Sequence, residues 1–258
     1  MKSSARWTID LFAALCPLLA RAEGDPAEYV FSPEVEQGER EIDSKAGIAW
    51  DRDGRSSWGG KLGVEYGLTA WWASEATVNF GRPLGESTEL LSLEWENRFQ
   101  LLKSDVHPYV IGALLEVERE HDRDEGYELR YGPLLQSAWG PLQVNLNLLF
   151  ERRLRARGEQ TPTEMGYQWQ WRWRRDASFD WGMQGFGALG RWDGWAPSAQ
   201  QAHVLGPVLF ARSFAAAAHG SGDDEGYGEL PEFEAGLLFG TGGEAPRVTL
   251  RLQAMIPF

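Results

Sequence analysis

The sequence predicts an all-β protein, a transmembrane antiparallel up-and-down β-barrel of about twelve strands. Three observations predict this class. Apolar and polar residues alternate along many segments, an export signal stands at the N-terminus, and the chain ends in an aromatic residue, Phe258. Successive side chains of a strand point to opposite faces, so an alternating segment separates two different environments. A spanning strand needs only about ten residues, half of them facing lipid, so such a barrel can be as polar overall as this chain.

The clearest alternation lies at 142–151 (LQVNLNLLFE). There, Val144, Leu146 and Leu148 are expected to face lipid, and Asn145 and Asn147 the interior. Similar patterns predict an even set of strands at 40–50, 58–67, 71–82, 89–101, 108–119, 127–137, 142–151, 164–174, 178–191, 203–212, 229–239 and 247–258. The alternation is weak at 178–191, where glycines occupy both faces, and at 203–212.

The predicted connections are of two kinds. Tight turns at residues 67–69 and 139–141 alternate with longer, charged loops such as 51–55 and 121–126. Short turns on one side and longer loops on the other are typical of outer-membrane barrels. Tryptophans gather at both strand ends, as expected for rings at two membrane interfaces. The stretch 212–228 departs from this pattern, because it is a long connection on the side of the tight turns.

The N-terminus predicts export. Lys2 and Arg6 precede an apolar run, and Ala20 and Ala22 match a signal-peptidase site, so residues 1–22 are interpreted as a signal peptide cleaved after Ala22. The expected domains are then a segment at 23–38, either periplasmic or a plug in the lumen, and the barrel at 39–258. The only cysteine, Cys16, falls in the signal, which excludes disulfides and a cysteine nucleophile from the mature chain.

The number and placement of the charged residues limit the functions that the chain can have. The net charge of −13 makes nucleic acid an unsuitable partner. Charged residues recur on the polar strand faces, where they either pair across strands or line water, because an unpaired charge in a dry interior is costly. The candidate lumen-lining residues are Glu41, Asp43, Lys45, Glu65, Glu75, Glu94, Glu96, Arg98, Glu116, Glu118, Glu128, Arg130, Glu164, Arg172 and Arg251.

No catalytic motif is present. A lipid hydrolase would require a serine beside a histidine, and no motif surrounds the candidate combinations, Ser137 or Ser213 with His203. Residues 51–54 and 121–126 superficially resemble calcium loops but lack the full ligand spacing. The sequence therefore predicts no metal site, no cofactor and no enzymatic activity.

Several segments resemble one known group. They are 38–42 (GEREI), 66–69 (YGLT) with Trp72, 95–100 (WENRFQ), 131–135 (YGPLL) and 251–258 (RLQAMIPF). Together they resemble an uncharacterised family of proteobacterial outer-membrane β-barrel proteins over nearly all of the mature chain. The resemblance implies a barrel in the bacterial outer membrane and a C-terminal signal for the barrel-assembly machinery, formed by Leu252, Ile256 and Phe258. It brings no activity and no functional residues.

The favoured function is a narrow passage for small solutes that prefers cations, because acids outnumber bases on the polar faces. At twelve strands the lumen falls between filled eight-stranded barrels and open porins, so a narrow or plugged passage is expected. The alternatives are a closed structural or adhesive barrel and, third, the lipid hydrolase. Outer-membrane lipid and lipopolysaccharide are the expected surroundings.

Overall fold

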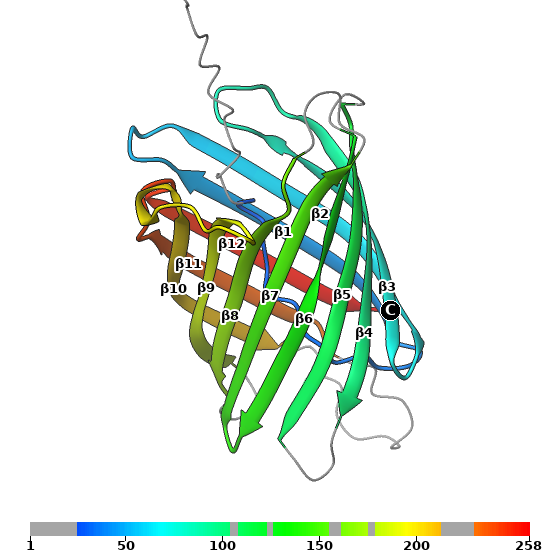
Figure 1. The fold of residues 1–258 in the computed structure, drawn as a ribbon. Coiled ribbons are helices and arrows are strands. Elements are labelled where there is room, and N and C mark those ends of the chain that lie inside the picture. Colours follow the sequence, from blue (N-terminus) through cyan, green and yellow to red (C-terminus); the bar gives the residue numbers. More distant parts are fainter. Residues whose placement is uncertain (1–24, 104–107, 123–125, 155–160, 175–178, 213–229) are drawn as a thin grey trace, which may run out of the picture.

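The structure is a computed structural model that describes residues 25–103, 108–122, 126–154, 161–174, 179–212 and 230–258. Twelve antiparallel strands close into one barrel in which each strand pairs with its neighbours in sequence and β1 pairs with β12 (Figure 1). This confirms the predicted fold class. The signal peptide and nearly all of the connection expected at 212–228 lie outside the described residues.

The strands follow the predicted segments closely. Their bounds are β1 Arg40–Trp50, β2 Ser56–Thr69, β3 Trp72–Arg82, β4 Glu89–Lys103, β5 Tyr109–Glu120, β6 Tyr127–Trp139, β7 Leu142–Leu154, β8 Glu164–Trp173, β9 Phe179–Arg191, β10 Ala202–Arg212, β11 Glu232–Gly240 and β12 Val248–Pro257.

The predicted bounds are wrong by up to three residues. Strand β2 begins two residues earlier than predicted, where Ser56 pairs with Trp50, and β11 begins three residues later. Trp71, expected to begin a strand, lies in the turn before β3, where its amide donates to the Thr69 hydroxyl.

The outer surface of the barrel is apolar. Leu62, Leu93 and Leu146 are about half exposed, whereas Asn145 and Asn147 on the neighbouring positions of β7 are buried. Even the outward Trp95 has its indole N–H satisfied, by the Ser74 hydroxyl at 2.9 Å. An apolar belt this continuous is compatible with lipid and not with water.

Exposed aromatic side chains gather at both ends of this belt. Trp71, Trp139 and Phe179 lie near the tight turns, and Trp192 and Trp195 lie in the loop after β9. This is the distribution of interfacial girdles in a transmembrane barrel. Among the described residues, no helix is long and apolar enough to cross a membrane.

Candidate channel lumen

One row of charged side chains runs around the inside of the barrel. Strand register places these residues directly opposite one another on consecutive strands β1 to β8: Glu41, Glu65, Glu75, Glu96, Glu116, Arg130, Glu151 and Glu164. We call this set the charged row. Strands in a barrel tilt, so a row perpendicular to them climbs along the axis. Accordingly Glu41 lies at the end of the barrel with tight turns, and Glu164 lies at the end with long loops.

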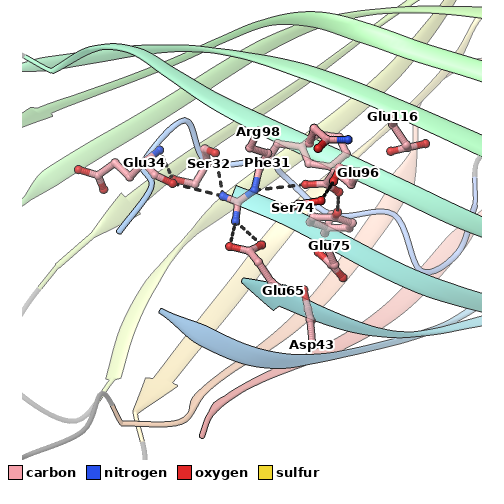
Figure 2. Close-up of polar contacts among 12 residues, drawn as sticks. Phe31, Ser32, Glu34, Asp43, Glu65, Ser74, Glu75, Glu96, Arg98 and Glu116 are labelled. Carbon is pink, nitrogen blue, oxygen red and sulfur yellow. Dashed lines mark hydrogen bonds and ion pairs between the residues drawn. The ribbon is translucent and has the colours of Figure 1, made fainter. Parts of the chain in front are cut away.

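Like charges directly opposite each other destabilise a sheet, so the charged row requires counterions. Arg98 supplies one, because its guanidinium bridges Glu65 and Glu96, the latter at 3.2 Å (Figure 2). Lys45 supplies a second, 3.5 Å from Glu75. Within the row itself, Arg130 lies 3.6 Å from both Glu116 and Glu151. The five acids between the two ends of the row, Glu65, Glu75, Glu96, Glu116 and Glu151, therefore each have a cationic partner.

A second cluster lies on the other side of the lumen. Arg172 lies 2.8 Å from Asp180 and 3.4 Å from Glu232, linking β8, β9 and β11. Arg251 on β12 contacts Glu234 at 2.9 Å and covers the Phe186 ring, 4.5 Å from its centroid. Charge pairing thus extends around the whole wall.

The structure places the sequence-predicted lumen candidates on inward-facing positions. Those that are buried are Asp43, Lys45, Glu65, Glu75, Glu94, Glu96, Glu116, Glu128 and Arg251. The remaining candidates, Glu41, Arg98, Glu118, Arg130, Glu164 and Arg172, keep some exposure. Leu252, Ile256 and Phe258 of the C-terminal strand point outward and are exposed.

Residues 25–38, which the sequence left as periplasmic or plug, contact the strands from inside. The Asn147 amide donates to the Phe31 carbonyl at 3.0 Å, and Arg98 donates to the Ser32 carbonyl at 3.0 Å. Lys61 lies 3.1 Å from Asp25 near one end, and Gly38 donates to Gly67 at the other. The blue segment inside the barrel in Figure 1 follows this path.

The same segment provides an apolar core that the sequence analysis missed. Phe31 is almost fully buried and packs with Tyr29, Leu114, Leu134 and Leu149. The Tyr29 hydroxyl also donates to Glu96, and the Lys45 ammonium lies 3.4 Å from the centre of the Tyr29 ring. No alternation marks residues 25–38. The sequence signal for this core lies in three Leu-Leu pairs, in which the inward Leu114, Leu134 and Leu149 are each adjacent to an outward leucine.

A cavity of about 360 Å³ lies between this segment and the long loops. Its lining includes charged side chains from β5 to β8, namely Glu118, Glu120, Glu128, Arg130, Glu151, Arg153 and Glu164. The opposite part of its wall is apolar, with Phe186, Val204 and Leu238 from β9 to β11. Sequence analysis missed this apolar wall because glycines obscure the alternation there.

The described residues contain one group of carboxylates close enough to share a cation, Glu94, Glu116 and Glu118. Lys61 already lies 3.1 Å from Glu94, and Arg130 pairs with Glu116. The loop acid Asp51, in a segment resembling a calcium loop, accepts hydrogen bonds from the amides of Asp53 and Arg55. These contacts explain both groups as local charge pairing and turn formation.

Ser137 and His203 do not form the serine–histidine pair that a hydrolase would require. Ser137 lies on β6 and donates to the Pro108 carbonyl, whereas His203 lies on β10, four strands away. His203 contacts instead the Tyr167 hydroxyl at 2.9 Å and Gln201 at 2.9 Å. Ser213 lies outside the described residues.

Comparison with known proteins supports the architecture. No protein-family model and no curated protein sequence matches the chain. Among solved structures, the COG4313 outer membrane channel from Pseudomonas putida F1 is similar, with a TM-score of 0.62 and 14% identity, covering 92% of this chain and 100% of that one. The NanC porin is similar as well, with a TM-score of 0.56 and 13% identity, covering 84% of this chain and 100% of the porin.

These findings define the class. The chain is a twelve-stranded antiparallel β-barrel with the fold of outer-membrane channels and porins. The structures that it resembles are channels and porins, and neither is described as an enzyme.

Proposed function

We propose that this protein is a narrow channel of the bacterial outer membrane that passes small solutes and prefers cations. The observation that carries the proposal is the excess of acids inside the barrel. Glu65, Glu75, Glu96 and Glu116 follow one another on β2 to β5, and Glu118 and Glu164 add carboxylates that form no ion pair among the described residues. Closely spaced carboxylates along a confined path with low-dielectric walls attract cations and repel anions. Export with cleavage after Ala22 brings the chain to that membrane, where lipopolysaccharide surrounds it.

The decisive measurement is single-channel current in planar bilayers with purified, folded protein. Discrete conductance steps and a reversal potential on the cation side in a salt gradient are expected. If no steps occur at any voltage, the protein is not a channel. A closed structural barrel would then be the better description, and the lumen contacts of residues 25–38 favour that second candidate.

Ion preference is expected to depend on particular acids. The Glu118 carboxylate accepts hydrogen bonds from Ser92 and Asn79, and Glu164 is exposed at the cavity. Neither contacts a cationic side chain among the described residues. Replacing both with glutamine is therefore expected to move the cation-to-anion permeability ratio towards unity while the barrel remains stable.

The matched control replaces exposed loop acids, Asp53 and Glu86, with glutamine or asparagine. Loop charges in water are screened within roughly 8–10 Å at physiological salt, so the permeability ratio should stay unchanged. An equal shift from the loop and lumen variants would refute lumen-based selection.

We further propose that residues 25–38 plug part of the lumen. Strand glycines make room for this segment, because a Cβ on Gly47 would lie 1.8 Å from the Pro26 carbonyl oxygen. Gly67 has the same relation to the Glu36 carbonyl, also at 1.8 Å. A side chain at either position cannot coexist with the segment where it lies.

Gly47→Ala is accordingly expected to displace the segment and raise single-channel conductance. Gly236→Ala is the control, since a Cβ on this inward-facing glycine of β11 would meet Val208 at 3.3 Å and the Pro207 carbonyl at 4.0 Å, and not the segment. Conductance should be higher in Gly47→Ala than in Gly236→Ala. Equal conductance in the two variants would show that residues 25–38 do not limit the current.

A further inference from the structure

The cavity towards the long loops has two unlike walls. Strands β5 to β8 present charged side chains, whereas β9 to β11 present Phe186, Val204 and Leu238. Val208 and Phe210 back this apolar wall in a buried cluster with Leu238. Strands β5 and β11 are six apart in a ring of twelve and therefore face each other across the lumen, whereas β8 and β9 are neighbours, so the two walls also meet along one side.

The apolar wall is unnecessary for conducting hydrated inorganic ions. Phe186 and Val204 are only partly buried on this wall, and a solute with an apolar body would bury them further by displacing water. The cavity volume of about 360 Å³ lies within the roughly 300–1,000 Å³ range of ligand pockets. The wall thus points to an organic solute.

The charged side chains that line the cavity determine whether it favours a positively or a negatively charged solute. The inward-facing bases are engaged: Lys61 lies 3.1 Å from Asp25, Arg153 3.3 Å from Glu128, and Arg251 2.9 Å from Glu234. Arg130 lies 3.6 Å from Glu28, in addition to its contacts with Glu116 and Glu151. Arg82, at the rim, donates to Ser56.

The acids have a surplus. Seven carboxylates line the cavity against five bases. Glu118 contacts only neutral Ser92 and Asn79 among the described residues, and Glu164 stands opposite another acid, Glu151. A bound cation would offset this surplus of negative charge, whereas an anion would have to compete with the acids that already contact Lys61, Arg153 and Arg251.

We propose that this cavity is a binding site for an amphipathic organic cation, an ammonium group carried on an apolar body. The ammonium lies against the carboxylates of Glu118 and Glu164, and the body packs on Val204 and on the exposed part of Phe186, which Leu238 supports from behind. This inference rests on the proposed channel function in one respect, since it names the class of solute that the passage selects.

The test is calorimetric titration of the folded mature protein in detergent with phenethylammonium. Methylammonium has the charge without the body, 2-phenylethanol has the body without the charge, and phenylacetate reverses the charge. Burying a phenyl ring is a large apolar gain, so phenethylammonium is expected to bind at least about tenfold more tightly than each of the three.

Variants locate the site. Leu238→Ala, with Val204→Ala as a second change on the same wall, should weaken phenethylammonium binding by about fivefold. Leu237→Ala is the matched control, because this neighbour on β11 points to the outside. Glu164→Gln should also weaken binding, and Glu86→Gln in an exposed loop should not.

The outcomes separate this inference from the channel function. Methylammonium binding as tightly as phenethylammonium, tighter binding of phenylacetate, or equal losses in Leu238→Ala and Leu237→Ala would overturn the inference, even if potassium currents persist. Phenethylammonium binding at the predicted wall without any potassium current would instead uphold the site and refute the channel.

Discussion

Arg98→Met is expected to lower the free energy of unfolding by about 3–5 kcal/mol, the usual cost of removing one partner of a buried ion pair. Arg98 neutralises Glu65 and Glu96 on two different strands and donates to the Ser32 carbonyl of the N-terminal segment (Figure 2). Its loss leaves two buried carboxylates without their counterion. Equilibrium unfolding in urea from lipid vesicles measures the change.

Two comparisons test the reason for this loss. Arg55→Met removes a similar side chain from an exposed loop pair with Asp51, and exposed pairs contribute no more than about 1 kcal/mol. Adding Glu65→Gln to Arg98→Met removes one stranded charge and should recover part of the stability. No recovery in the double variant would show that packing of the long side chain, and not charge, explains the loss.

Much of the fold could be predicted because strand alternation is a local signal. At 142–151, each lipid-facing residue is apolar and each inward-facing neighbour is an amide or acid, with the sole exception of Leu149. A one-residue slip would exchange the two faces, so the pattern fixes the orientation of the strand. The even number of predicted strands and the unequal lengths of their connections then indicated a closed barrel.

The interior was less predictable, because it depends on contacts between distant segments. On β9, Gly185 and Gly187 lie beneath the rings of Trp169 and Tyr167 from the neighbouring strand, so the outer face of β9 is covered by side chains of β8. No residue within 178–191 indicates that side chains of β8 cover this face. The apolar wall formed with β10 and β11 was missed for the same reason.

The charged row illustrates the same limit. Sequence identified Glu75, Glu96 and Glu116 as inward-facing acids, but only the register shows that they are directly opposite one another. The location of residues 25–38 likewise depends on long-range contacts, such as that of Phe31 with Asn147. Local periodicity therefore predicts which face a residue occupies, and pairing decides which residues meet.

Leu146→Arg is expected to lower the stability of the folded barrel by about 2–4 kcal/mol, because an arginine near the membrane midplane must leave water without a partner. Leu146 is near the middle of β7, points outward and is 45% exposed on the apolar belt. The measurement is reversible folding into liposomes of the wild type and the variant.

Leu154→Arg is the matched control. Leu154 has the same side chain, strand and outward face, and it ends β7 beside a long loop, where it is 40% exposed. The cost of an arginine falls to about 0–1 kcal/mol near the interface, because its guanidinium reaches water and headgroups. A depth-dependent difference between the two sites is specific to a lipid environment, since water would solvate both arginines alike. Equal stability of the Leu146→Arg and Leu154→Arg variants would mean that the apolar belt does not face a bilayer.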